Sequence, residues 1–247
     1  MRLLLVNPNT TEALTERLAA SARAVLPEGV ELILVTAREG FPYISSRAEA
    51  QIAGAEVLTA LAERHGEVDA AVIAAFGDPG LRAARELFDM PITGMTEASM
   101  LIACSLGERF AFVTFTPALG PWYSEQVRIA GLDSRFAGFH TPDGAFADIK
   151  TVAGDLKAPL TEVCRVAARI ADVVILAGAP IAGLASEIRG DVDAVLLDPV
   201  QAAVVSIVGL HRLAPDGASL GPFARPSAKP STVPPDALSR LISRGSE

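Results

Sequence analysis

Two similar stretches of this sequence combine a short apolar run with a glycine-rich turn, a combination that suits the binding of a small molecule. The first covers residues 72–81 (VIAAFGDPGL) and the second covers residues 173–184 (VVILAGAPIAGL). Each apolar run predicts a buried strand, and the Gly and Pro residues predict the turn that ends it. Open α/β sheets bind ligands where strands end in such turns, so we expect the two stretches to border one site.

Asp78 is the ionisable residue nearest to the first turn. Asp78 followed by Pro79 is typical of a helix start, with an N-cap side chain and proline at the first helical position. We therefore expect Asp78 to cap a helix over 81–87 and to be the acid–base candidate of this segment.

Polar groups that suit a carboxylate or an amide follow other predicted strands. Asn7, Asn9 and Thr10 follow the first strand, and Thr114 and Thr116 take the same place in the second half. Turn and cap chemistry explains these residue types equally well. Further candidates are Tyr43 on the irregular loop 38–46 and the backbone N–H of Ala179, next to which Pro180 lacks a donor.

Alternating strands and helices must position these groups. The predicted strands cover 2–6, 31–36, 69–76, 91–95, 109–115, 135–140, 172–177 and 193–198. The predicted helices cover about 11–26, 47–65, 81–87, 96–106, 121–130, a stretch ending at 170, 181–188, 199–213 and 236–243. This order predicts an α/β fold of two pseudo-symmetric three-layer lobes with parallel sheets and a cleft between them. We place the first lobe at 1–96 plus 198–247 and the second at 97–197, and expect residues 214–235 to be extended or mobile.

Composition excludes several classes of function. The 247 residues carry a net charge of −8, which argues against nucleic acid or an anionic membrane as a partner. The N-terminal apolar run is too short for a signal peptide or a membrane span, so we expect a cytoplasmic protein. The two cysteines and three histidines lack the spacing of a metal site, and no glycine-rich nucleotide motif is present, so we expect no metal and no organic cofactor.

The sequence resembles the aspartate/glutamate/hydantoin racemase superfamily, and within it the hydantoin and allantoin racemase branch. The resemblance rests on Val6–Thr10, Ile73–Leu81 and Leu176–Ala179 and covers about residues 1–213. It implies two α/β lobes with the active site between them, and cofactor-free interconversion of the enantiomers of cyclic ureides. It also implies a small carboxylate or ureide ligand, and we expect a homo-oligomer. The substrate-binding positions that it implies are Asn7, Asn9, Thr10, Tyr43, Phe76, Gly77, Thr114, Phe115, Thr116 and Ala179.

The sequence departs from this family at the two positions that matter most. Similar racemases remove the α-proton with one cysteine and return a proton to the opposite face with a second cysteine, but here those positions hold Ala75 and Gly178. Neither side chain can carry a proton. Cys104 and Cys164 lie in predicted helices, where we interpret them as small buried hydrophobic residues.

Four interpretations follow. The chain is a racemase-family protein whose thiols are absent naturally or by mutation, or a related lyase, decarboxylase or hydrolase that uses Asp78, His140 or a water. A third interpretation is a non-catalytic protein that binds a small carboxylate. The fourth, a periplasmic-type binding protein, is disfavoured because we see no export segment.

Overall fold

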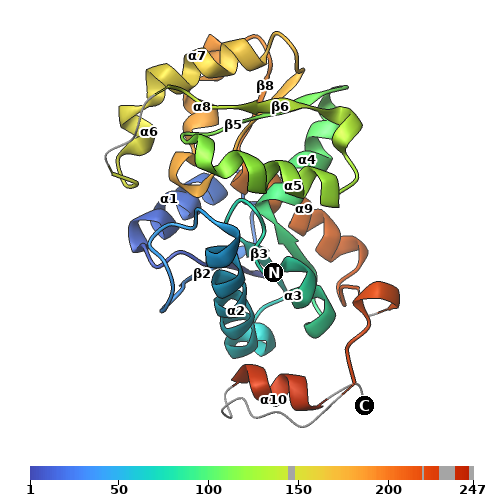
Figure 1. The fold of residues 1–247 in the computed structure, drawn as a ribbon. Coiled ribbons are helices and arrows are strands. Elements are labelled where there is room, and N and C mark those ends of the chain that lie inside the picture. The colour runs from blue at the N-terminus through green and yellow to red at the C-terminus, as the bar shows by residue number, and fades with distance from the viewer. Residues whose placement is uncertain (144–147, 219, 228–236, 245–247) are drawn as a thin grey trace.

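The chain folds into two α/β lobes that lie one above the other in Figure 1, each built on its own parallel sheet. The computed structural model describes residues 1–143, 148–218, 220–227 and 237–244. Within those ranges, no helix is long and apolar enough to cross a membrane.

Both sheets have four strands in the same relative order, β2-β1-β3-β4 and β6-β5-β7-β8. Leu5 pairs with Val72 in the first sheet, and Phe112 pairs with Ile175 in the second. The strands of the first sheet are β1 (Arg2–Asn7), β2 (Glu31–Thr36), β3 (Ala70–Ile73) and β4 (Ile92–Gly94). Those of the second are β5 (Phe110–Val113), β6 (Phe136–His140), β7 (Val173–Leu176) and β8 (Val195–Leu197). The predicted α/β class with two parallel sheets is confirmed.

The two halves also repeat a local contact at the start of their third strands. Asp69 precedes β3 and accepts a hydrogen bond from the backbone N–H of Arg2 at 2.6 Å. Asp172 precedes β7 and accepts one from the N–H of Arg109 at 2.9 Å. The sequence similarity of these two segments therefore reflects equivalent positions in the two sheets.

Strand alternation gives the first lobe its three layers. Leu4 and Val6 of β1 pack in one core cluster with residues of α2, α3 and α10, whereas Leu3 and Leu5 pack in another with residues of α1, α4 and α9. Successive side chains of a strand point to opposite faces, so each face of this sheet is covered by helices. These helices are α1 (Glu12–Arg23), α2 (Arg47–Arg64), α3 (Leu81–Leu87), α4 (Met95–Leu106), α9 (Pro199–Leu213) and α10 (Ala237–Arg244).

The second lobe has a core rich in phenylalanine, with Phe110 and Phe112 of β5 fully buried. Helix α7 contacts β5 and β6, and α5 contacts β6. Helix α4 contacts β4 of the first sheet as well as β5, β7 and β8 of the second, so it joins the lobes. The helices of this lobe are α5 (Gly120–Ile129), α6 (Val152–Asp155), α7 (Lys157–Ala167) and α8 (Leu184–Glu187).

After β8 the chain returns to the first lobe. Helix α9 packs on β3, β4 and α1, and α10 packs on α2, below it in Figure 1. Leu241 of α10 is buried in the core cluster that contains Leu4 and Val6.

Side-chain caps mark the starts of two helices. Ser46 caps α2 and forms a capping box with Glu49, and Asp198 caps α9 by accepting the backbone N–H of Val200 at 2.9 Å. The side chain of Thr11, in contrast, does not cap α1, because its hydroxyl donates to the carbonyl of Pro42 at 2.9 Å.

Three predicted helices are shorter than the apolar pattern indicates, and one of them is α7, which ends at Ala167 rather than at residue 170. Helix α1 ends at Arg23 rather than near residue 26. The predicted helix over 181–188 is divided into a 3₁₀ turn, Ala179–Ile181, and α8, because Gly183 between them has a φ of +89°. Of the predicted extended segment 214–235, residue 219 and residues 228–235 lie outside the described residues.

Candidate functional site

The two glycine-rich segments begin where the central strands of the two sheets end. Ala74 and Ala177 each donate a last backbone N–H to a neighbouring strand at 2.8 Å. Ala75 and Gly178 come next, so equivalent turns follow β3 and β7. Ala75 is 4% exposed and belongs to the core cluster of the second lobe. This position therefore lies at the junction of the lobes.

Gly178 has a backbone conformation that suits glycine alone. Its φ is +126°, a region that residues with a Cβ rarely adopt. A Cβ built at Gly178 would lie 3.1 Å from the ring of Phe115 and 3.4 Å from Oγ1 of Thr114. A cysteine here would require both a strained backbone and a shift of its neighbours.

The predicted binding residues Asn7 and Asn9 are buried and hydrogen-bonded to the protein itself. Asn7 Oδ1 accepts from the backbone N–H and the side-chain amide of Asn9, at 3.0 and 2.7 Å, and its Nδ2 donates to Thr15 Oγ1 at 2.9 Å. Asn9 Oδ1 accepts from the N–H of Ile44 at 3.1 Å. The two amides thus hold loop 38–46 against the end of β1.

The predicted threonines have three different environments. Thr114 is buried and its hydroxyl donates to the carbonyl of Ala177 at 2.5 Å, which links the ends of β5 and β7. The backbone N–H of Thr10 donates to Phe41 O at 2.9 Å, in a half-buried position. Thr116 is half-buried and precedes a 3₁₀ turn.

Aromatic side chains fill the junction between the lobes. Tyr43 and Phe76 come from the first lobe, and Phe115, Trp122 and Tyr123 come from the second; we call these five residues the aromatic wall. The rings of Tyr43 and Phe115 lie 5.8 Å apart, and those of Phe76 and Tyr123 lie 4.6 Å apart. Tyr43, Phe76 and Phe115 were predicted for the site, whereas Trp122 and Tyr123 were not, because no local pattern marks them.

Gly77 allows the closest approach of the two lobes at this wall. Its φ is +104°, and a Cβ on it would lie 2.2 Å from the indole of Trp122. The backbone N–H of Gly77 donates to the buried Thr96 hydroxyl at 2.5 Å. The glycine is therefore required by both its conformation and the indole ring.

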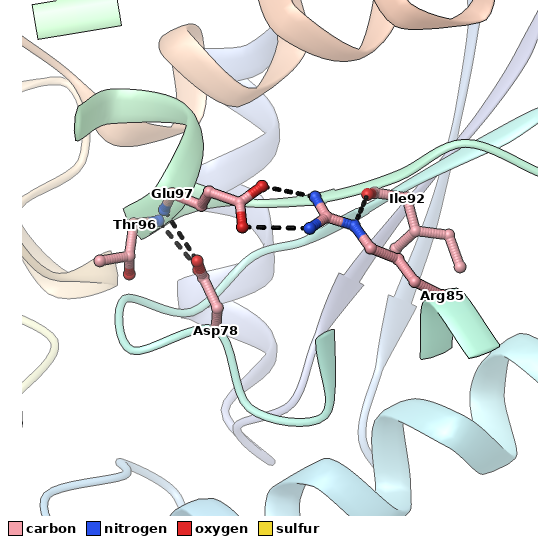
Figure 2. A network of polar contacts seen from close by, with 5 residues as sticks. All are labelled: Asp78, Arg85, Ile92, Thr96 and Glu97. Atoms are coloured by element: carbon pink, nitrogen blue, oxygen red, sulfur yellow. Dashed lines mark hydrogen bonds and ion pairs between the residues drawn. The ribbon is translucent and has the colours of Figure 1, made fainter. Parts of the chain in front are cut away.

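Asp78 caps a different helix from the one predicted. Figure 2 shows its carboxylate at the start of α4, where it accepts the backbone N–H groups of Thr96 and Glu97, each at 2.8 Å. Helix α3 begins at Leu81, with Gly80 at its N-cap. The prediction that Asp78 caps 81–87 is thus wrong, because the carboxylate satisfies free N–H groups of a helix distant in sequence.

A bidentate ion pair adjoins Asp78. Arg85 of α3 donates to both carboxylate oxygens of Glu97 at 3.0 and 2.6 Å, and its Nε donates to the carbonyl of Ile92 at 3.0 Å (Figure 2). The side chains of Arg85 and Glu97 are 17% and 34% exposed. The pair ties α3 to the start of α4.

Burial changes the protonation of the acidic groups near the wall. Burial raises the pKa of Asp78 to about 7, although the hydrogen bonds from Thr96 and Glu97 oppose this shift. Burial also raises the pKa of Tyr123 well above its usual value, and the nearby Tyr43 and Asp78 add to this effect. A carboxyl group that titrates near neutrality therefore lies beside the first turn.

The remaining candidates lie apart from this arrangement. Nε2 of His140 is buried beside Gly138 and has no hydrogen-bond partner among the described residues; burial lowers its pKa. Cys164 is buried, which raises its pKa to about 12, and Cys104 is half-buried. In the described ranges, no group of three or more His, Cys, Asp or Glu residues is placed to hold a metal ion.

Comparison with protein families identifies one family over most of the chain. The model of the family described as "Asp/Glu/Hydantoin racemase" matches residues 3–207. A hydantoin racemase of Paenarthrobacter aurescens is 30% identical over 235 residues, which cover 93% of this chain and 99% of that protein.

Solved structures agree with this match. Allantoin racemase from Klebsiella pneumoniae is 32% identical with a TM-score of 0.89, over 96% of this chain and 98% of that one. Allantoin racemase from Pseudomonas fluorescens is 29% identical with a TM-score of 0.83, over 94% and 99% of the two chains. An arylmalonate decarboxylase has the same fold at 16% identity, with a TM-score of 0.60 over 99% and 100% of the two chains.

Proposed function

Because this chain belongs to the Asp/Glu/hydantoin racemase family, we propose that it binds a small carboxylate or cyclic ureide between its lobes without racemising it. The ligand class is suggested by the relatives named as hydantoin and allantoin racemases. The loss of racemisation is suggested by Ala75 and Gly178 at the positions where the family resemblance requires thiols. Racemisation needs a proton donor or acceptor on each face of the carbanion, and neither residue provides one.

The observation that carries this proposal is the backbone of Gly178. A φ of +126° with the Phe115 ring nearby disfavours every side chain at this position, not only the missing thiol. The second half of the site therefore has neither a proton carrier nor a backbone conformation that favours one.

In this proposal the predicted residues divide into two roles. The backbone of Phe76, Gly77 and Ala179 and the side chains of Thr10 and Thr116 contact the ligand, with Tyr43 and Phe115 forming its apolar boundary. Asn7, Asn9 and Thr114 are positioning residues, because their polar atoms already bond to the protein. The lobe boundaries 1–96 plus 198–247 and 97–197, the homo-oligomeric state and the cytoplasmic location remain predictions.

The decisive experiment is incubation of one enantiomer of 5-benzylhydantoin, or of allantoin, in deuterium oxide. Chiral analysis should show retention of configuration, and calorimetry should show binding. Loss of optical activity at an enzymic rate would contradict the proposal, because it would require two acid–base groups.

Single cysteine substitutions test the two faces separately. Ala75→Cys should introduce deuterium with retention of configuration at a rate about 10²-fold or more above Ala75→Ser, its isosteric control. Gly178→Cys should instead lower the free energy of unfolding by about 1–3 kcal/mol through backbone strain, and the double variant should not racemise. Racemisation by the double variant would show that the second turn readily accepts a thiol.

One-sided proton transfer by Asp78 is a second candidate function, as in a lyase, decarboxylase or hydrolase. The pKa of about 7 favours it, since a group that titrates near neutrality can donate or accept a proton. Its two hydrogen bonds to α4 favour a positioning role instead. Deuterium exchange by the wild type that disappears in Asp78→Asn would support this candidate.

A further inference from the structure

A groove of about 660 Å³ adjoins the first turn, and its lining includes Gly77 and Asp78 but neither Ala75 nor Gly178. Its walls come from α2, α3 and the 77–80 loop of the first lobe and from α4 and α5. The volume lies in the range typical of sites for small organic molecules. Of the residues that the proposed function uses, Gly77 and the alternative acid–base group Asp78 line this groove.

Charged side chains of both signs line the groove. Glu97 lines it with a side chain that is 34% exposed, and Arg85 occupies only one acceptor position on each of its oxygens. A carboxylate has about four such positions, so Glu97 can accept further donors. Asp78 adds a second carboxyl group to the lining, and the free acceptor positions of Glu97 suit an ammonium group.

An unpaired guanidinium also lines the groove. Arg82 of α3 is exposed, and no carboxylate of the described residues lies within 4.0 Å of it. It is therefore available to an anionic group. A molecule that pairs with both Glu97 and Arg82 carries a positive and a negative charge.

The rest of the surface suits an apolar or aromatic body. Trp122, Met100 and Leu58 line the groove, as does Phe223, whose ring centroid lies 5.8 Å from Cζ of Arg85. Gln51 of α2 and Gln126 of α5 provide amide groups from different helices.

We propose that this groove is a second binding site, distinct from the positions of Ala75 and Gly178, for a zwitterionic amino acid with an apolar or aromatic side chain. Its carboxylate pairs with Arg82, its ammonium group pairs with Glu97, and its side chain packs against Trp122 and Met100. Because the groove also includes Gly77, the bound amino acid contacts the turn that borders the cleft.

Trp122 is the single tryptophan of the chain, so its fluorescence reports on this groove. Titration with L-phenylalanine should change the emission with a Kd of about 1 mM or tighter. Phenethylamine, which lacks the carboxylate, and 3-phenylpropanoate, which lacks the ammonium group, should each bind about tenfold more weakly.

Two variants assign the binding to the groove. Ala55→Phe fills it from an exposed position of α2 and should abolish the response, whereas Ala48→Phe, an exposed position of the same helix outside the groove, should retain it. Arg82→Gln should remove the preference for phenylalanine over phenethylamine. Circular dichroism checks that each variant is folded.

Three results would overturn this proposal. They are no response to phenylalanine at about 10 mM by fluorescence and calorimetry, equal binding by Ala55→Phe, and competition by 5-benzylhydantoin, which would place both molecules in one site. The hydantoin experiment tests the inter-lobe cleft independently of these outcomes.

Discussion

At the scale of single residues, an aspartate next to a glycine turn has a structural partner far along the chain. The carboxylate of Asp78 accepts two backbone N–H groups of α4 and packs against Gly94, where a Cβ would lie 2.2 Å from its Cγ. The same Asp-Pro dipeptide at Asp198 and Pro199 does cap the helix that follows it. Local sequence alone therefore does not identify which helix an aspartate caps.

The pKa of Asp78 predicts how stability depends on pH. The pKa of Asp78 is about 7 in the folded protein, whereas the ordinary value of 3.8 applies to the unfolded chain. Between these two pH values the folded state therefore binds more protons than the unfolded state. The contribution of Asp78 to the free energy of unfolding is present in full below pH 3.8 and is lost as the pH rises to about 7. Asp78→Asn should lack this dependence, measured as the difference in free energy of unfolding from the wild type across this range.

An exposed aspartate provides the control for this measurement. Asp193→Asn should follow the wild-type curve, because Asp193 has no hydrogen bond or ion pair among the described residues. A constant difference between the wild type and Asp78→Asn at all pH values would contradict the assigned burial of this carboxyl group.

Gly77 permits a second prediction at this scale. Gly77→Ala introduces strain at a φ of +104° and a contact with Trp122, so it should lower the free energy of unfolding by about 2–4 kcal/mol. Gly183→Ala is a matched control, since its φ is +89° and nothing lies within 4 Å of the added Cβ. Gly183→Ala should lower the free energy of unfolding by only about 1–2 kcal/mol. Equal losses in urea denaturation would show that the indole moves aside freely.

At the scale of elements, the ion pair between Arg85 and Glu97 joins α3 to α4. It is bidentate and largely enclosed, unlike the exposed pair between Arg64 and Glu67 on one helical turn. A double-mutant cycle with alanine at 85 and 97 should give a coupling energy of about 1–2 kcal/mol, against about 0.3–0.5 kcal/mol for positions 64 and 67. Similar values for the two cycles would mean that burial adds nothing to the first pair.

The elements themselves were largely predictable from periodicity and caps. The run 69–76 contains β3, Ser46 begins α2, and Asp198-Pro199 begins α9, because each of these signals is local. The aromatic wall was only partly predictable. Trp122 meets Gly77, and Asp78 meets Thr96, through contacts between distant segments that leave no mark on either stretch of sequence. The same reason explains why the groove beside Arg82 could not be anticipated.

At the scale of the whole molecule, the two lobes share part of one core. Ile44, Ala53 and Phe76 of the first lobe belong to the same buried cluster as Phe112 and Leu176 of the second. The lobes therefore cannot separate fully without exposing apolar surface to water. This arrangement favours a single cooperative unfolding transition rather than independent melting of two units.

Two probes test this cooperativity. Trp122 fluorescence reports on the second lobe where it meets the first, and far-UV circular dichroism reports on the helices of both, so their urea transitions should coincide.

Phe76→Ala should lower the free energy of unfolding by about 3–5 kcal/mol, because it removes a buried ring from the junction. The midpoints of both transitions should therefore fall together. Arg47→Ala removes the exposed ion pair with Glu125 and the hydrogen bond from Nη2 to the carbonyl of Pro121 at 3.3 Å, both between α2 and α5, so it should change stability by less than about 1 kcal/mol. A fluorescence transition that precedes the loss of helix in the wild type would show that the junction opens first, and the shared core would then not hold the lobes together.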